Sequence, residues 1–362
     1  MTNTRLTIRP PADFDLARDV CSYGYFLLAP NHWDPETHSL FRVLTLDDAN
    51  NKSAGKPAPT TCRITQASRN TRQTRPWRKP GLSSDNQSRA NTKEPRLASG
   101  PRTGSTLTAR FDRPLTRTEQ AQAREQIRRM LSLDTTEADS RDFHKTDKRW
   151  KKSGRARLFR SPTLFEDIVK TVTSCNVAWP STINMNARLC EALGGRSPSG
   201  GHAFPTPAKL ARTRAPTLRS RCRVGYRDQR IIDLARLFTK GRIDEAWLTH
   251  PTMSDDDAFK FLLTLPGVGP YAAGNIMQLL GRFSRLALDT ESVRHGKAVL
   301  GYTGTDRDIL KQLEAHYEPF GRHKFRSYWF ELWDYYESKR GPAHTWDRET
   351  TGKSFTAALL KD

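Results

Sequence analysis

The chain has 362 residues, of which 60 are Lys or Arg and 39 are Asp or Glu, so its formal net charge is +21. This length predicts two or three domains. The charge favours a polyanionic partner, because each phosphate that a protein neutralises releases condensed counterions. A soluble protein with a cationic tail would have the same composition. No run of about 18 uncharged apolar residues is present, which excludes a transmembrane helix.

The start of the chain, MTNTRLTIRPPADFD, lacks the apolar core of a signal peptide, so we do not expect a secreted protein. We expect it in the cytoplasm with the nucleoid if it is bacterial, and in the nucleus if it is eukaryotic. The five cysteines are scattered and form no C-x-x-C pair, which indicates a reducing compartment and argues against zinc or an iron–sulfur cluster.

Residues 1–115 have the pattern of a small α+β domain. The segment DFDLARDVCSYG is a candidate helix over 13–24. Short apolar or alternating segments predict strands, which are LTIRPP at 6–11, YFLLAP at 25–30, HSLFRVLTL ending at 46, and STLTARFD at 105–112.

A segment of another kind interrupts this domain at 51–104. It holds twelve Lys or Arg and two Asp or Glu, shows no periodicity and has little aliphatic bulk. Such a composition does not bury enough surface to offset its ordering entropy. We therefore predict a disordered basic loop between two strands, able to contact DNA without sequence specificity.

From residue 116 to 340 the pattern is helical throughout, which predicts an all-α domain. Its first helix opens with a Thr116 or Thr118 cap, and a second follows a cap and proline at Ser161–Pro162. Further helices are expected at 181–193, 207–213, 217–223, 227–239, 254–264, 270–282, 305–320 and 323–340. Residues 341–362 read as a polar, loose C-terminal tail.

The segment LTLPGVGPYAAGNI, ending at residue 276, places two glycines and a proline between apolar runs. Its G-x-G-x-x-A pattern resembles a dinucleotide fingerprint, but that motif requires a preceding strand, and SDDDAFKFLLTL reads as a helix. A helix, a tight turn and a second helix fit better. The free amides at the start of the second helix suit a phosphate. A plain helical corner would not need the second glycine.

LPGVGPYAAGNI, followed by Asp289 in LALDTESVR, resembles the helix–hairpin–helix DNA glycosylase superfamily. Upstream, LFEDIVKTVTSCNVAWPSTINMNARLCEALGG, FPTPAKLA and VGYRDQRI are similar in order and spacing to 8-oxoguanine glycosylases. AREQIRRMLSL and an N-terminal antiparallel sheet resemble 3-methyladenine glycosylases. The resemblance covers roughly residues 105–340. It implies a mainly α fold, in which a small α+β domain with an antiparallel sheet precedes an all-α helix–hairpin–helix domain.

The resemblance implies that Asp289 is the catalytic carboxylate, which stabilises positive charge on the sugar and orients water. The same residue also suits an N-cap of the following helix. Family members that also nick the strand carry a lysine two residues after the second hairpin glycine. Tyr271 stands there, which predicts an enzyme without lyase activity, although Lys260 and Lys297 are possible substitutes.

Other roles follow from the same resemblance. Gly267, Val268 and Gly269 would grip a phosphate, and Arg294 would contact another. Asn176 would fill the gap left by a flipped base, or it caps a helix; Tyr226 and Arg227 would contact the opposite strand. Ser181 stands where the 8-oxoguanine enzyme has an arginine that reads cytosine, which weakens that assignment.

An aromatic base pocket is expected around Tyr271 and Trp179, with Trp329 and Trp333 as further walls, although each tryptophan also suits a core. The carbonyls of Leu263, Leu265 and Val268 would hold a monovalent cation; no other cofactor is expected. The predicted protein is a monomeric, monofunctional DNA glycosylase that acts on alkylated bases in double-stranded DNA. The alternatives are an oxidised-purine glycosylase and a hairpin DNA-binding protein without catalysis.

Overall fold

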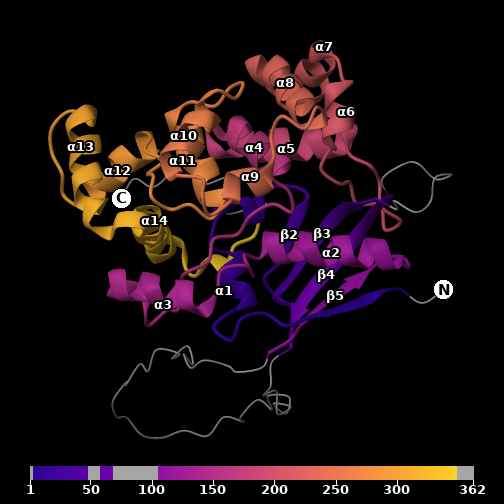
Figure 1. The fold of residues 1–362 in the computed structure, drawn as a ribbon, viewed down its shortest axis with the longest axis horizontal. Helices are drawn as coiled ribbons and strands as arrows, with labels where there is room; N and C mark the ends of the chain where they lie inside the picture. The colour runs from indigo at the N-terminus through magenta and orange to yellow at the C-terminus, as the bar shows by residue number, and fades with distance from the viewer. Residues whose placement is uncertain (1–2, 48–57, 68–104, 349–362) are drawn as a thin grey trace, which may run out of the picture.

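The computed structural model describes residues 3–47, 58–67 and 105–348, and the structural statements below concern these residues. A five-stranded sheet lies on one side of the molecule, and most helices lie above and beside it (Figure 1). The sheet is antiparallel with the order β1-β5-β4-β3-β2. Its strands are β1 Arg5–Ile8, β2 Asn31–Asp34, β3 Ser39–Leu46, β4 Ala58–Gln66 and β5 Leu107–Phe111.

One row of side chains crosses the whole sheet and explains its register. Leu6 pairs with Ala109, Ala109 with Ile64, Ile64 with Leu40, and Leu40 with Trp33. All five are buried. Because side chains alternate between the two faces of a strand, a slip by one residue would expose this row.

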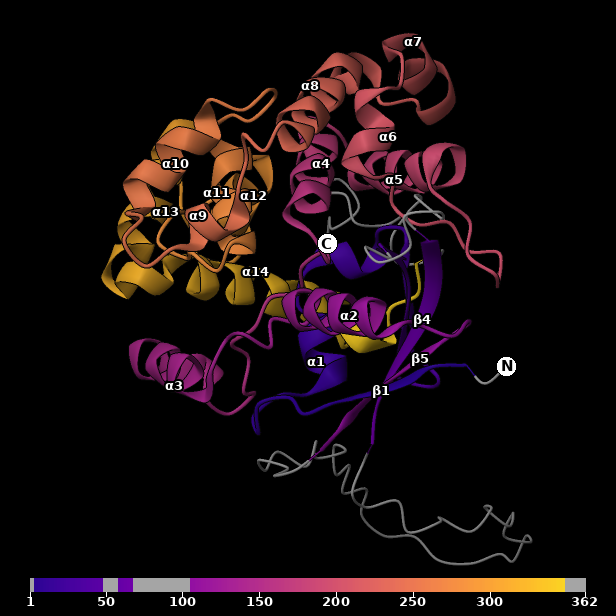
Figure 2. The same cartoon turned by 45° about the vertical axis from the view of Figure 1, so that its right-hand side comes forward.

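Helix α2 (Arg117–Met130) crosses the sheet, as Figure 2 shows. Its N-cap is Thr116, one of the two candidates from the sequence, and a capping box joins it to Glu119. Ala123, Ile127 and Met130 recur at helical spacing on its buried face. Buried side chains of the sheet and of this helix therefore share one core, which also includes Phe26, Tyr317 and Trp333.

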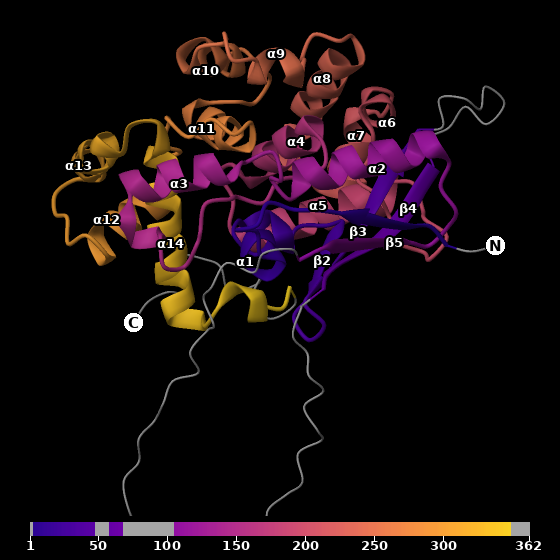
Figure 3. The ribbon, with the colours of Figure 1, turned by 60° about the horizontal axis from the view of Figure 1, so that its bottom comes forward.

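The remaining helices form the second part of the chain, where the described residues beyond β5 contain no further strand, only a bridge between Arg196 and His202. Helices α6 and α7 lie at one end of this part, and α12, α13 and α14 lie at the other (Figure 3). The bounds are α1 Leu16–Val20, α3 Glu137–Thr146, α4 Leu164–Ser174, α5 Trp179–Leu193, α6 Pro207–Ala211, α7 Ala215–Thr217, α8 Asp228–Thr239, α9 Glu245–Thr249, α10 Asp255–Leu263, α11 Pro270–Leu279, α12 Thr290–Ala298, α13 Asp306–Tyr317 and α14 Lys324–Arg340. Short 3-10 turns are η1 Gly24–Leu27, η2 Lys148–Trp150, η4 Gly225–Arg227, η5 Glu318–His323 and η6 Ala343–Thr345, and η3 Leu218–Cys222 is a π-helical turn.

Three local predictions were wrong. The segment at 25–30, expected as a strand, contains the turn η1 and is wholly buried up to Ala29, so its apolar run reflects burial rather than pairing. Helix α4 is capped by Thr163, not by Ser161. The Oγ1 of Thr163 accepts the N–H of Glu166. Strand β4 lies inside the segment 51–104 that was predicted to be disordered, and it pairs with both β3 and β5. The rest of that segment, apart from Ala67, lies outside the described residues.

The start of the predicted polar tail is packed against the N-terminal domain. Trp346 is 2% exposed and lies against Phe26 and Trp333. The indole N–H of Trp33 donates to the carbonyl of His344 at 2.8 Å. Residues 341–348 are thus part of the fold, while 349–362 lie outside the described residues. In the part of the chain that the structure describes, no helix combines the length and apolar character needed to cross a membrane.

Candidate active site

The glycine-rich segment forms a hairpin between α10 and α11. Ser254 caps α10, which ends at Leu263, and Gly269 is the N-cap of α11, which begins at Pro270. Gly267 has a φ of 80°, a conformation that L side chains rarely adopt. The helix–turn–helix prediction from the sequence is therefore correct, and the dinucleotide alternative is excluded.

Gly269 leaves the backbone of the hairpin open to the outside. Its φ is −98°, which any residue adopts, and a Cβ at this position would meet nothing within 4 Å. Neither backbone conformation nor packing within the protein therefore requires a glycine here. The residue is exposed at the start of α11, where free amides and the helix dipole favour an anion.

Gly274 brings a second segment close to α11. A Cβ at this residue would lie 2.6 Å from the carbonyl oxygen of Leu286 and 3.1 Å from the Cα of Ala287. Only a glycine permits such an approach of the strand-like segment that leads to Asp289. Direct backbone packing therefore brings the segment of Asp289 against the second helix of the hairpin.

Asp289 caps helix α12 with one carboxylate oxygen and leaves the other free. Its Oδ1 accepts the backbone N–H groups of Glu291 and Ser292, both at 3.0 Å, and the Ser292 hydroxyl at 3.2 Å. Oδ2 accepts no hydrogen bond from any residue that the structure describes. The two interpretations of Asp289 from the sequence, a cap and a reactive carboxylate, are therefore compatible in one side chain.

The surroundings of Asp289 raise its pKa above the ordinary value. Burial is the largest cause, and the charge of Glu291 adds to it, while hydrogen bonds from Ser292 act in the opposite direction. Glu291 is itself held by Arg294, at 2.7 Å from Nε, and by the hydroxyl of Tyr336. A raised pKa at a cavity wall is typical of functional carboxylates, although ion-pair networks produce it too.

A cavity of about 1080 Å³ opens in front of this carboxylate and the hairpin. Its walls come from η1, the α4–α5 connection, the hairpin, the segment before α12, and α14. Of the site residues predicted from the sequence, it is lined by Asn176, Trp179, Tyr226, Gly267, Val268, Gly269, Tyr271, Asp289, Trp329 and Trp333. Segments far apart in the sequence therefore meet at one site.

Aromatic rings form much of the cavity wall. On α14, Phe325, Trp329 and Trp333 follow at intervals of four residues and stack with ring centroids 6.0 and 5.4 Å apart. Trp329 donates its indole N–H to the carbonyl of Ser22 at 2.9 Å, so the N-terminal domain fixes this wall. The sequence allowed these tryptophans to line a pocket or to pack in the core. Trp329 and Trp333 do both, since they pack with the core and also line the cavity.

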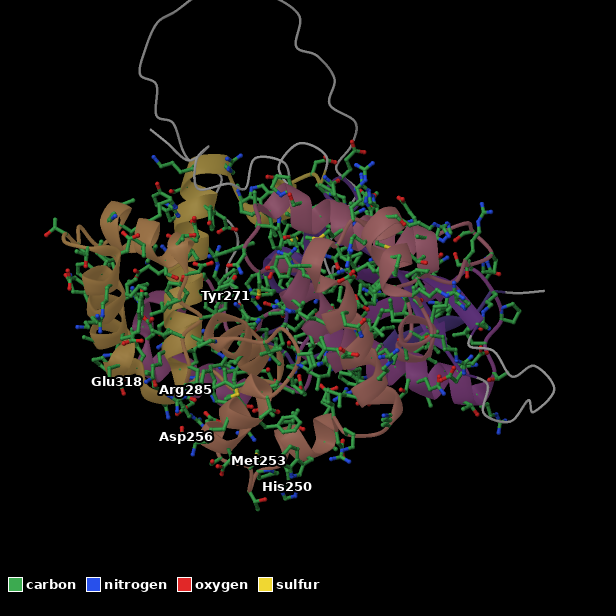
Figure 4. All side chains as sticks on the ribbon, turned by 90° about the horizontal axis from the view of Figure 1, so that it is seen from above. His250, Met253, Asp256, Tyr271, Arg285 and Glu318 are labelled. Atoms are coloured by element: carbon green, nitrogen blue, oxygen red, sulfur yellow. The ribbon has the colours of Figure 1, made fainter. Side chains whose placement is uncertain are left out.

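Tyr271 lies inside the helical part, next to α14, whereas His250 lies at the edge of the molecule in this view (Figure 4). Burial raises the pKa of Tyr271 well above its ordinary value, and the charge of Asp289 raises it further. The ring is therefore an uncharged phenol beside the carboxylate. A neutral aromatic face in such a place attracts a flat or cationic ligand.

Two neutral polar groups at the cavity were not predicted from the sequence. The hydroxyl of Tyr23 donates to Asn275 Oδ1 at 2.9 Å, and Asn275 Nδ2 donates to the carbonyl of Tyr271 at 3.2 Å. This leaves Asn275 with one further N–H and one further lone pair. Nothing in CSYGYF distinguishes a pocket tyrosine from a core tyrosine, so sequence reasoning had no signal for this pair.

The rim of the cavity holds Asn176, Tyr226 and Arg230. The C-cap of α4 is Cys175, and Asn176 follows it with a left-handed φ of 53°, so the expected cap lies one residue earlier. Its Nδ2 lies 3.4 Å from the Tyr226 hydroxyl, and Tyr226 is 52% exposed. Arg230, missed in the sequence, stacks on Tyr226 with its guanidinium 4.9 Å from the ring centroid. Tyr226 and Asn176 thus project together beside the hairpin.

Two predicted DNA contacts have other partners in the structure. Arg227 is 4% exposed, and its guanidinium donates to the carbonyls of Val172, at 3.1 Å, and of Cys175. We correct its role to that of fixing the backbone just before Asn176. Arg294 pairs with Glu291 and lies over the ring of Tyr335 at 4.7 Å, away from the cavity wall.

No lysine lines the cavity among the described residues. Lys260 is exposed on α10, and Lys297 pairs with Asp306 at 3.0 Å. Lys170 is fully buried but pairs with Glu166 at 2.7 Å. The two substitutes considered in the sequence for a nucleophilic lysine are therefore directed elsewhere.

The three backbone carbonyls proposed for a monovalent cation lie at the end of α10 and in the hairpin. Those of Leu263 and Val268 accept no hydrogen bond from the described residues, while that of Leu265 accepts the N–H of Val268 at 3.1 Å. Free carbonyl oxygens at a helix C-terminus carry partial negative charge. Two of the three carbonyl oxygens are therefore free to accept a ligand, and the monovalent cation itself stays a prediction.

No protein-family model matches the chain, and no curated protein matches it in sequence. Solved structures do match. The 8-oxoguanine glycosylase/lyase of Clostridium acetobutylicum, at 15% identity, superposes with a TM-score of 0.58 over 91% of this chain and 98% of that one. The same enzyme in complex with double-stranded DNA gives a TM-score of 0.58 at 15% identity over 93% and 99%. The 3-methyladenine DNA glycosylase of Archaeoglobus fulgidus, at 16% identity, gives 0.57 over 92% and 99%.

At these identities the likeness establishes the fold. The chain has the fold of helix–hairpin–helix DNA glycosylases, in which an α+β domain with an antiparallel sheet precedes a helical domain. The fold class predicted from the sequence is confirmed. The structures that share it come from glycosylases of both the 8-oxoguanine and the 3-methyladenine type, so the comparison favours neither substrate.

Proposed function

We propose that the protein is a monofunctional DNA glycosylase that hydrolyses the N-glycosidic bond of alkylated bases in double-stranded DNA. The observation that carries this proposal is the Asp289 carboxylate, which presents a free Oδ2 beside an aromatic cavity of about 1080 Å³ and the hairpin. A protein that only binds DNA has no need of such a carboxylate.

The chemistry follows from the charge that develops during bond cleavage. Positive charge grows on the sugar as the base leaves, and a nearby carboxylate stabilises it. Oδ1 of Asp289 is held by three hydrogen bonds, so Oδ2 has a fixed position from which it can orient the attacking water. The hairpin amides at Gly269 would hold a phosphate of the damaged strand.

The absence of lyase activity is proposed from the residues around Asp289. Strand nicking by these enzymes requires a primary amine that forms an imine with the sugar. The cavity wall in the described chain presents Tyr271 and no lysine. A phenol does not form an imine, so the product would be an intact strand with an abasic site.

Alkylation at a ring nitrogen gives the base a positive charge and makes it a better leaving group. The rings of Tyr271, Trp179 and Trp329 offer electron-rich faces for such a base. One observation favours oxidised or deaminated purines as a second candidate substrate: the Asn275 amide, which offers a hydrogen-bond donor and an acceptor at the same cavity.

The test measures strand breaks on end-labelled duplexes that contain 7-methylguanine, a 3-methyladenine analogue or 8-oxoguanine, with and without hot alkali. We expect breaks that require alkali, that are strongest with an alkylated base, and that disappear with Asp289→Asn. Breaks without alkali would contradict monofunctional action. Retained DNA binding with no breaks on any duplex would support the non-catalytic alternative.

A further inference from the structure

A long stretch of the chain carries positive charge without any compensating acid. Between Glu191 and Asp228 there is no Asp or Glu, and there are eight Lys or Arg. Five of these arginines, which we call the arginine surface, are exposed: Arg212, Arg214, Arg219, Arg221 and Arg223. Of the five, Arg219 alone forms an ion pair with a described residue, Asp228.

The backbone that carries these arginines is anchored. Leu218, Cys222 and Val224 are each 0% exposed and alternate with the arginines at 219, 221 and 223. The π-helical turn η3 packs against α5, and α6 packs against α8. The guanidinium groups therefore project from a fixed support, which lowers the entropy lost when they bind a ligand.

The arginine surface is continuous with the rim of the cavity. After Arg223 the chain turns through Gly225 to Tyr226, whose ring contacts Arg230 and whose hydroxyl lies beside Asn176. A Cβ on Gly267 of the hairpin would lie 2.9 Å from Cδ of Arg230. The surface thus begins at the rim and extends toward α6 and α7, at the end of the molecule away from α13 (Figures 1 and 2).

We infer that the arginine surface holds backbone phosphates of the duplex on one side of the damaged base, the side that faces Tyr226. Arginine presents a planar fork of donors that matches phosphate oxygens, and unpaired arginines on one face create a field that attracts a polyanion. This inference rests on the proposed binding of DNA at the cavity, but it does not depend on excision.

The test is a binding measurement on duplexes that carry a tetrahydrofuran abasic-site analogue at the centre or near either end. The variant combines Arg214→Gln, Arg221→Gln and Arg223→Asn. Asparagine is chosen at 223 because the φ of 54° there is left-handed, which this residue tolerates. The matched control combines Arg110→Gln, Arg117→Gln and Arg128→Gln, which removes the same charge from exposed positions on β5 and α2.

We expect the arginine variant to bind the central-site duplex at least tenfold more weakly than the control. Its plot of log affinity against log salt should be shallower by about two to three, since each lost phosphate contact removes about 0.9. The loss should vanish when the analogue lies near one particular end and persist when it lies near the other. Excision at saturating DNA should be unchanged, because these residues are outside the cavity.

Equal affinities and equal salt slopes for the two triple variants would overturn the inference, and so would a loss that is the same for both end positions. A wild-type protein that binds these duplexes but excises no base would contradict the proposed enzyme and leave the arginine surface standing. Thermal unfolding of both variants verifies that each is folded.

Discussion

The hydroxyl of Tyr23 donates a hydrogen bond of 2.9 Å to Oδ1 of Asn275, a residue 252 positions later in the chain. Tyr23 precedes the turn η1 of the N-terminal domain, and Asn275 lies on α11, the second helix of the hairpin. The cavity is therefore built between the two parts of the fold, and the Asn275 amide is oriented by the part that does not carry Asp289.

Replacing Asp289 with asparagine should abolish excision and leave DNA binding intact. The loss should reach at least about 10²-fold, because the group that stabilises the developing charge is removed. The amide oxygen still caps α12. Burial raises the pKa of Asp289, so the ionised side chain opposes folding at neutral pH, and the variant should have an equal or higher Tm. Single-turnover excision and thermal unfolding at pH 7 measure both effects.

Substitutions at two neighbours of Asp289 should shift the pH profile of excision in opposite directions. The active form is the carboxylate, so activity falls as pH drops through its raised pKa. Glu291→Gln removes a negative charge that raises this pKa, and the acid limb should move to lower pH. Ser292→Ala removes a hydrogen bond that lowers it, and the limb should move to higher pH. Shifts in the same direction for both variants would contradict this assignment.

Tyr271 should act through its ring rather than its hydroxyl. Tyr271→Phe keeps the aromatic face and should leave excision of 7-methylguanine within about threefold. Tyr271→Ala removes the face, and the loss of a cation–π contact of about 0.5–2 kcal/mol should lower kcat/KM by about 2- to 30-fold. If phenylalanine is as damaging as alanine, the hydroxyl has a role that the structure does not suggest.

Asn275 should discriminate between substrates. Asn275→Leu removes the donor and acceptor, so kcat/KM for a neutral purine such as hypoxanthine should fall about five- to tenfold, the value of roughly one hydrogen bond. Excision of 7-methylguanine, which depends on stacking and a good leaving group, should change less. Tyr23→Phe frees the amide to rotate and should have a smaller effect in the same direction. Equal losses on both substrates would assign Asn275 a structural role.

Glu166 should be critical for stability. It lies between two buried cations, Arg42 at 2.9 Å and Lys170 at 2.7 Å. Burial alone would raise the pKa of Glu166, but these two charges outweigh it and lower the pKa to about 2. The stabilisation is therefore present above the unfolded pKa and is lost as pH falls toward 2. Glu166→Ala leaves both cations unpaired and should cost about 3–5 kcal/mol in urea unfolding.

A matched control for this measurement is Glu137→Ala. Glu137 pairs with Arg141 at 3.6 Å and accepts the backbone N–H of Ala12 at 3.1 Å, and both charged side chains are exposed to water. Water screens such a pair, so the loss should stay below about 1 kcal/mol. Similar losses of unfolding free energy for the two variants would show that the buried ion pairs of Glu166 stabilise the fold no more than an exposed pair does.

Local patterns were sufficient wherever a residue's role depends on its neighbours in sequence. The threonine cap of α2, the glycine hairpin before Pro270 and the cap at Asp289 each depend on contacts within a few residues, and all three were predicted from the sequence. Strand β4 was hidden because its basic flanks obscured an alternating segment that pairs with β3 and β5 on both sides.

Tertiary packing decided which of those residues reach the cavity. Arg227 and Tyr226 are adjacent in the sequence, yet the Arg227 guanidinium is buried and donates to backbone carbonyls, whereas the Tyr226 ring is exposed. Tyr23, Asn275 and the tryptophans of α14 meet because the N-terminal domain packs onto the end of the helical part. Composition and periodicity describe what a segment can bury. They carry no information about which distant segment will cover it, because that depends on the packing of the whole chain.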